Sequence, residues 1–290
     1  MSNSTVNFTS SYSTNSTTQS FGPLDICLLS ISLLVGLPTH FCIIWLIITG
    51  TESGVASAFF NLNLSVCEIG NCLFCFFDAL TISFSRLKIV SNLLEGLSIT
   101  GRPLFQCLIS VECYLAVVHP VSFLKYKPLR YRVICCTAAW IITLGSCFIS
   151  MLILMLHNTT AHTWFSVLQF LLFFFIQLFC LVAVLRALKQ SGPGERKKEE
   201  ESHIKRKAFY LILISTIAIT FIYVPYIIIG FCFVLTQQLM KELYSFSYVC
   251  YVLAGFVQPV LYLHSTLEFC EFSPQNTVHP QRQDTHSSGE

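Results

Sequence analysis

WFSVLQFLLFFFIQLFCLVAVLRAL, the stretch from Trp164 to Leu188, decides the class of fold. Its 25 residues include one charged side chain, Arg186, which lies near the end of the run. About 20 apolar residues in a helix cross the ~30 Å hydrocarbon core of a bilayer, where the backbone must satisfy its own hydrogen bonds. The run is continuous rather than alternating in polarity, so it predicts a transmembrane helix and not a barrel strand.

Six further apolar runs have a comparable length: Leu24–Ile48, Ala56–Leu80, Ile89–Val118, Val133–Leu156, Ala208–Leu235 and Leu243–Leu263. We therefore predict an all-α membrane protein with a seven-helix bundle over 24–263, an outer tail over 1–23 and an inner tail over 264–290. Only 11% of the residues are charged, against about 25% in an average soluble domain. This composition argues against a water-soluble enzyme, and a net charge of +2 argues against a nucleic-acid-binding protein.

The orientation follows from the basic residues. Twelve of the 17 lysines and arginines fall in the loop after the third run and in the segment joining the fifth and sixth runs. Loops rich in Lys and Arg stay in the cytoplasm, which predicts an extracellular N-terminus and a cytoplasmic C-terminus. These basic segments form part of a partner surface or bind anionic membrane lipid. Gln190–Lys207, with its Gly, Pro and charged residues, predicts a flexible cytoplasmic loop.

Possible modification sites agree with this orientation. Glycosylation sequons on the predicted outer side begin at Asn3, Asn7, Asn15 and Asn158. Most of the 14 cysteines lie inside apolar runs, where a free cysteine is a small buried hydrophobe. Cys270, just after the seventh run, is a candidate for palmitoylation, and a plain free cysteine is the alternative.

Three segments carry a family resemblance. The third run ends ECYLAVVHP at 112–120, the sixth contains FIYVPY at 221–226, and the seventh ends QPVLY at 258–262. They resemble the D-R-Y-L-A-V-V-H-P, aromatic-x-P and N-P-x-x-Y stretches of rhodopsin-like (class A) G protein-coupled receptors. GLP at 36–38 and the Pro-Tyr of the sixth run are similar to the purinergic-like branch. The resemblance implies a multi-pass plasma-membrane receptor that passes an extracellular ligand signal to a heterotrimeric G protein or arrestin.

The same resemblance implies coupling or activation roles for eight residues: Glu112, Cys113, Tyr114, Tyr223, Pro225, Gln258, Pro259 and Tyr262. The two prolines remove backbone hydrogen bonds and kink their helices, although prolines are common in membrane helices of any function. In the family an arginine follows the acidic residue, and it pairs with that acid at rest and contacts the G protein when active. Cys113 has neither the charge nor the donor fork of arginine. We therefore expect weak, atypical or absent coupling, and a non-signalling decoy or dimer partner is the alternative.

The family's sodium site is also altered. His40, Glu68, Arg102 and Gln258 stand where relatives have asparagine, aspartate, serine and asparagine. A charge at the bilayer centre costs about 2.5–3.5 kcal/mol on insertion scales, so we predict that Arg102 pairs with Glu68 and replaces sodium with a fixed ion pair. The alternative is that Arg102 faces water or snorkels. Pro103 should distort the helix beside it. No disulfide is expected, because Lys88 and the cysteine-free loop 157–163 occupy the positions of the family bridge.

Five residues are candidate ligand contacts by their position near the outer side: Asp78, Asn92, Glu95, Tyr226 and Tyr248. Two acids facing an outer cavity favour a cationic ligand, or they balance Arg86, Lys88 or Arg102. A secondary transporter is a more remote possibility, because the intramembrane charges would suit it but inverted repeats are not found. No motif of an intramembrane enzyme, a metal site or a cofactor site is recognised.

Overall fold

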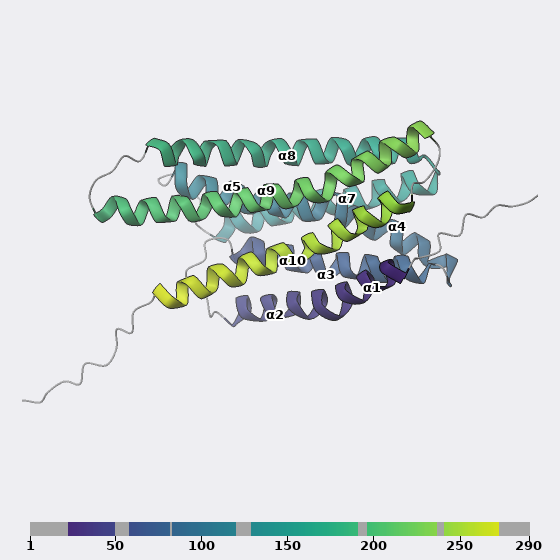
Figure 1. The fold of residues 1–290 in the computed structure, drawn as a ribbon, viewed down its shortest axis with the longest axis horizontal. Helices are drawn as coiled ribbons and strands as arrows, with labels where there is room; N and C mark the ends of the chain where they lie inside the picture. The colour runs from purple at the N-terminus through teal and green to yellow at the C-terminus, as the bar shows by residue number, and fades with distance from the viewer. Residues whose placement is uncertain are drawn as a thin grey trace, which may run out of the picture.

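A computed structural model describes residues 23–49, 58–81, 83–119, 129–190, 196–236 and 241–272. Nearly all of the described residues lie in helices (Figure 1). In chain order the elements are α1 (Pro23–Ile31), η1 (Ser32–Gly36), α2 (Leu37–Ile48), α3 (Ala58–Leu80), η2 (Ser85–Leu87), α4 (Lys88–Gly96), η3 (Leu97–Gly101), α5 (Arg102–Val118), α7 (Leu129–Met155), α8 (Thr159–Gln190), α9 (Arg196–Thr236) and α10 (Lys241–Phe272).

Among the described residues, each of the seven predicted runs lies in a helix or in a continuous series of helical turns, except that the fourth run ends one residue after α7. Six of these are long and apolar enough to cross a membrane: Cys27–Ile48, Ala58–Leu80, Ser85–Val118, Arg130–Met155, Thr159–Lys189 and Phe209–Thr236. The seventh run lies in α10, whose apolar stretch among the described residues is the shorter segment Ser245–Val257. The all-α prediction is therefore confirmed, and a bundle of seven spans is consistent with it.

Four helices, α7 to α10, extend beyond their predicted ends, and α9 and α10 do so by the most residues. The prediction of a flexible loop at Gln190–Lys207 is wrong from Arg196 onward, because α9 already begins there. Its first residues are Arg, Lys and Glu, which are good helix formers, so local propensity prevails after the Gly-Pro-Gly break. At the other end of the chain, α10 continues to Phe272, past the predicted end of the seventh run at Leu263.

The first and third spans each contain a π-helical turn. In the third span the turn is η3, and the N–H of Arg102 bonds back to the carbonyl of Leu97. Pro103 follows directly and lacks an N–H group, so the helix resumes with a different register of hydrogen bonds. The distortion predicted from Pro103 is therefore confirmed. The turn η1 is likewise followed by Pro38 in α2.

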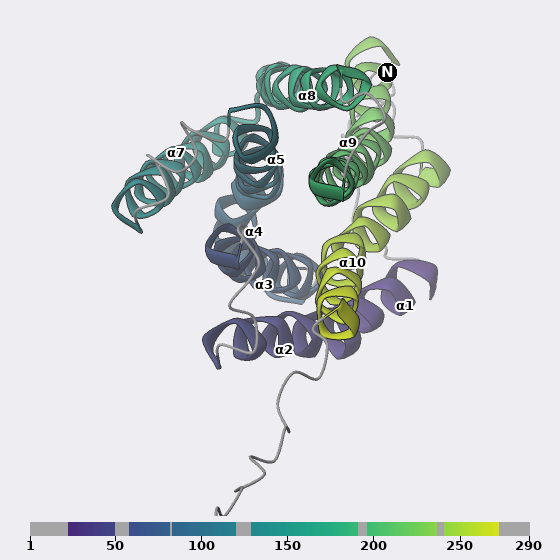
Figure 2. The same cartoon turned by 90° about the vertical axis from the view of Figure 1, so that its left-hand side faces the viewer.

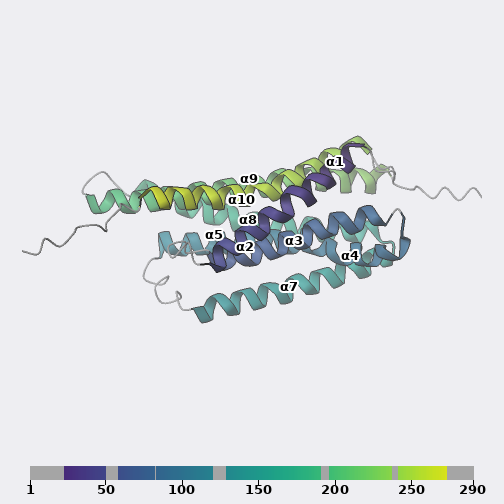
Figure 3. The same ribbon diagram turned by 90° about the horizontal axis from the view of Figure 1, so that it is seen from below.

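The third span, formed by α4, η3 and α5, occupies the interior of the bundle. It packs against α3, α7, α8 and α9 (Figure 2). Helix α7 lies at one edge of the bundle (Figures 2 and 3). Gly96 allows α4 to approach α7 closely, because a Cβ there would lie 2.3 Å from the Cα of Cys147. This packing brings polar side chains of the third span against α3, α9 and α10.

Candidate functional site

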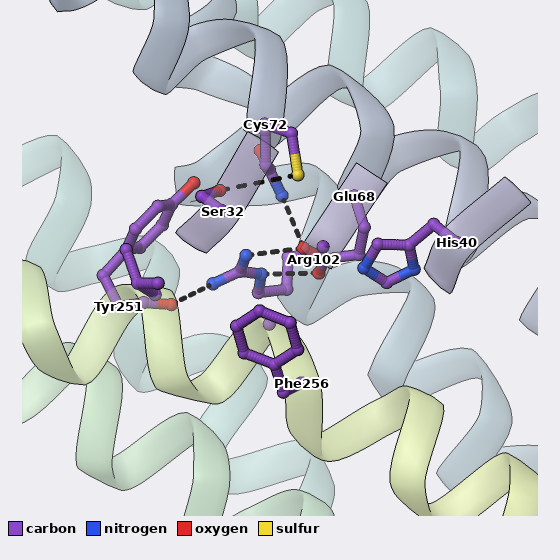
Figure 4. A pocket seen from close by; sticks show the side chains of 11 residues that line it. Ser32, His40, Glu68, Cys72, Arg102, Tyr251 and Phe256 are labelled. Atoms are coloured by element: carbon purple, nitrogen blue, oxygen red, sulfur yellow. Dashed lines mark hydrogen bonds and ion pairs between the residues drawn. The ribbon is translucent and has the colours of Figure 1, made fainter. Parts of the chain in front are cut away.

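Glu68 of α3 and Arg102 of α5 form a buried ion pair (Figure 4). Arg102 Nε donates to Glu68 Oε1 at 2.6 Å, and Arg102 Nη2 donates to Glu68 Oε2 at 2.5 Å. Both side chains are only 3% exposed. The pair predicted from the sequence is therefore present, and Arg102 neither faces water nor snorkels.

Helix α10 holds the arginine from the other side. Arg102 Nη1 donates to the carbonyl oxygen of Tyr251 at 3.3 Å, and the guanidinium carbon lies 4.4 Å from the centre of the Tyr251 ring. Asn71 Nδ2 donates to Glu68 Oε2 at 3.3 Å from one turn further along α3. The guanidinium is therefore held by a carboxylate, a carbonyl and an aromatic face.

Uncharged groups extend this network to α9. The Ser98 hydroxyl donates to Asn71 Oδ1 at 3.1 Å and lies 2.7 Å from the Tyr251 hydroxyl. The Tyr223 hydroxyl donates to the Ser98 carbonyl at 2.5 Å, a carbonyl that belongs to the π turn η3. Sequence reasoning missed Asn71, Ser98 and Tyr251. The only signal was the spacing of Asn71 three residues after Glu68, which places both on one helix face.

His40 of α2 lies beside the carboxylate of Glu68 (Figure 4). It is 2% exposed, and its Nδ1 has no hydrogen-bond partner among the described residues. His40, Glu68 and Arg102 line one small cavity, so the structure brings together three of the four residues assigned to the altered sodium site. The fourth, Gln258, belongs to α10, but its side chain is not described.

A second ion pair lies at the end of the bundle that the sequence predicts to be cytoplasmic. Arg132 Nη2 of α7 donates to Glu112 Oε1 of α5 at 2.5 Å. The side chains of Arg132 and Glu112 are 20% and 7% exposed. The sequence left Glu112 without a partner because Cys113 replaces the neighbouring arginine, and the structure corrects this. Arg132 was missed because it counted only as one of many basic loop residues.

The residues around Glu112 pack closely. Cys113 is half-buried and lines a narrow space together with Ile212 and Ser215 of α9. The Tyr114 hydroxyl lies 3.1 Å from His119 Nε2, and the Tyr114 ring contacts the edge of Phe179. Cys113 therefore faces α9.

Glu95 lies toward the opposite end, in α4. The Tyr226 hydroxyl of α9 donates to Glu95 Oε1 at 3.4 Å, and His162 Nε2 of α8 lies 3.5 Å from the same oxygen. The structure therefore brings together two predicted ligand contacts, Glu95 and Tyr226. It adds His162, which sequence reasoning missed and for which the sequence offers no signal.

The other predicted ligand contacts, Asp78, Asn92 and Tyr248, belong to α3, α4 and α10. Asp78 accepts a hydrogen bond from Ser91 at 3.0 Å. Asn92 is half-buried in α4, and the Tyr248 ring stacks on the Tyr251 ring with centroids 6.5 Å apart. Within the described residues, no ion pair joins Asp78 or Glu95 to a lysine or an arginine.

Several predicted sites have only a partial structural description. Pro225 and Pro259 lie inside α9 and α10, as the kink predictions require. Asn158 is exposed in the turn before α8, and its Oδ1 accepts the N–H of Ala161 at 3.0 Å. Asn3, Asn7 and Asn15 lie outside the described residues. Tyr262 and Cys270 belong to α10, but their side chains are not described.

Comparisons with known proteins agree with this arrangement. The family model described as "7 transmembrane receptor (rhodopsin family)" matches residues 40–262. The human C-C chemokine receptor type 8 is 27% identical over 193 residues, and the match covers 54% of this chain and 50% of that receptor. The human chemokine XC receptor 1 is 31% identical over 120 residues, and the match covers 37% of this chain and 35% of that receptor. The matches thus span half or less of each relative.

The family match covers the ion pair, the Glu112 region and every helix from α3 to α9. It extends over well more than half of the chain. The chain therefore belongs to the rhodopsin family of seven-transmembrane receptors, which are membrane-embedded receptors and not enzymes.

Proposed function

We propose that this chain is a plasma-membrane receptor that carries the signal of an extracellular ligand to a heterotrimeric G protein or arrestin, with weak or atypical coupling. The observation that carries the proposal is the family match over 40–262 together with Cys113 in the place of the coupling arginine. Ligand binding would shift a two-state helix bundle toward the form that accepts the partner.

The orientation and the domain limits are part of the proposal. The N-terminus (1–23) would be extracellular and glycosylated, and the C-terminal tail (264–290) cytoplasmic. The basic residues support this, because Arg132 near the start of α7, Lys189 near the end of α8 and Arg206 in the first part of α9 fall at one end of the bundle (Figure 1). The same basic residues would contact a partner or anionic lipid.

The proposed ligand carries a cationic group. Glu95 lies within 3.5 Å of Tyr226 and His162, and the described residues give it no lysine or arginine partner. An acidic group in such surroundings gains from a cation supplied by a ligand. Asp78, Asn92 and Tyr248 are further proposed wall residues. Because two relatives are named as chemokine receptors, chemokines are the first ligands to test, whereas the purinergic-like branch rests on GLP and Pro-Tyr alone.

The fixed ion pair would replace the sodium site of relatives. Arg102 presents its positive charge to Glu68 from within the chain, where relatives bind a mobile cation. In the same way, Arg132 of α7 supplies the cation for Glu112 that the missing arginine would supply. In both cases the positive partner of an acidic residue belongs to another helix. This supports an altered change between the inactive and active states rather than loss of the fold.

A ligand screen in cells tests the proposed function. Wild type and Glu95→Gln are expressed at matched surface levels and exposed to chemokines and to cationic peptides, with G-protein activation and arrestin recruitment recorded separately. A ligand that recruits either partner through wild type, with lower potency at Glu95→Gln, supports the proposal. A ligand that binds and recruits neither partner favours the decoy, which Cys113 makes a specific alternative. Uptake of a solute by vesicles holding the purified protein would instead favour a transporter.

A further inference from the structure

We propose that Glu95 of α4 and His162 of α8 together bind a zinc ion. The site contains the carboxylate that the proposed function assigns to a cationic ligand, but zinc binding needs neither that ligand nor a coupling partner. Two further side chains support the site, namely Ser150 of α7 and Tyr226 of α9, so four helices meet there.

The two ligating atoms lie at the spacing that zinc requires. His162 Nε2 is 3.5 Å from Glu95 Oε1. Zinc binds a histidine nitrogen at about 2.0–2.1 Å and a carboxylate oxygen at about 2.0–2.2 Å, usually with tetrahedral geometry. Two such ligands on one tetrahedral ion are therefore about 3.3–3.5 Å apart. The distance between Nε2 and Oε1 matches this spacing.

The hydrogen bonds around His162 Nε2 are long. Its two oxygen neighbours are Ser150 Oγ at 3.3 Å and Glu95 Oε1 at 3.5 Å, whereas N–H···O bonds in proteins usually measure about 2.9–3.0 Å. When the Ser150 hydroxyl donates to Nε2, this nitrogen and the Glu95 oxygen both present lone pairs to each other. A metal cation between the two atoms stabilises that arrangement.

The surroundings of Glu95 suit a metal ligand. The Tyr226 hydroxyl donates to Glu95 Oε1 at 3.4 Å, and carboxylates that bind metals are commonly oriented by such hydrogen bonds. Among the described residues, Glu95 has no ion pair with a lysine or an arginine, so no charged side chain competes there with the metal. The side chain of Glu95 is 22% exposed, which leaves a path for an ion.

The donor atoms favour zinc at modest affinity. The described residues contain no group of three or more His, Cys, Asp or Glu side chains that could hold a metal ion. The site therefore has two protein ligands, with water at the remaining positions, and is weaker than a structural zinc site with four. A histidine nitrogen with a single carboxylate favours zinc over calcium, which takes six to eight oxygen ligands.

Equilibrium dialysis of the purified full-length chain against zinc chloride, without any receptor ligand, tests the site. Changing a second-shell partner typically costs about 10–100-fold in metal affinity, so Glu95→Gln and His162→Gln, which remove a ligand, should each weaken zinc binding at least about tenfold. His157→Gln is the matched control, because His157 is an exposed histidine in the turn before α8. Equal zinc affinity of wild type and His162→Gln would overturn the proposal, whether or not a cationic ligand signals through Glu95.

A variant that adds a ligand tests the geometry without removing one. Ser150→Cys puts a thiol beside His162 Nε2, and thiolate is a strong zinc ligand. Ser146→Cys, one turn earlier in α7, is the matched control, because Ser146 is hydrogen-bonded to Thr100 instead. We expect Ser150→Cys to bind zinc about tenfold more tightly than wild type, a change of the size seen for altered metal shells, and Ser146→Cys to match wild type. Equal affinity of the two cysteine variants would refute the site, even if His162→Gln does not fold.

Discussion

Replacing Arg102 by leucine removes the cation of the buried pair and puts an apolar side chain in its place in α5. The change deletes two charge-assisted hydrogen bonds of 2.6 and 2.5 Å and the contact at 4.4 Å with the Tyr251 ring. It also leaves Glu68, at 3% exposure, without a counter-charge. Breaking a buried ion pair from one side costs about 3–5 kcal/mol, which lowers the ratio of folded to unfolded protein roughly 100- to 4,000-fold.

The assay combines cell-surface staining with thermal unfolding of the detergent-solubilised protein. Arg86→Leu is the matched control, because Arg86 is an exposed arginine at the start of the same span. The double variant with Glu68→Gln and Arg102→Leu removes both charges and should recover much of the lost stability, since replacing both partners is far less costly than orphaning one. If Arg102→Leu behaves like Arg86→Leu, or if the double variant is no better than Arg102→Leu, the reasoning is wrong.

Three further predictions concern the Arg132–Glu112 pair, the Tyr223 contact and the orientation of the chain. Arg132→Gln should lower the stability by about 1–3 kcal/mol in thermal unfolding, because it strips the cation from Glu112 at a partly exposed site; an unchanged melting temperature would contradict this. Tyr223→Phe should cost about 0.5–1.5 kcal/mol in the same assay, because the Ser98 carbonyl loses its hydroxyl donor; equal stability would show that the contact contributes nothing. An N-terminal epitope tag should bind antibody on intact cells and a C-terminal tag only after permeabilisation, and the reverse result would invert the proposed orientation.

The sequence predicts the helices and one ion pair because both follow from the cost of polar groups in lipid. Uninterrupted apolar runs leave helices as the solution, and two opposite charges within those runs require each other. Pro103 likewise predicts its own distortion, since it removes a backbone donor whatever the surroundings.

The other residues of the site depend on how the helices pack, which the sequence does not show. Arg132 reaches Glu112 only because α7 packs against the third span, to which α5 belongs. In the sequence, Arg132 stands among basic residues that the predicted orientation already explains. Asn71, Ser98 and Tyr251 are uncharged, so they carry no insertion cost that demands a partner. The start of α9 at Arg196 was missed because a charged Gly-Pro segment is typical of a loop, although its residues also favour a helix.

We propose that Cys113, in the place of the coupling arginine, weakens coupling of this receptor to the G protein. The direct test compares wild type, Cys113→Arg and Cys113→Leu with one activating ligand and equal surface expression. Cys113 faces Ile212 and Ser215 in a space too narrow for water, so Cys113→Leu controls for added volume without charge. We expect weak G-protein activation by wild type and by Cys113→Leu, and clearly stronger activation by Cys113→Arg. Equal activation by wild type and Cys113→Arg would contradict it.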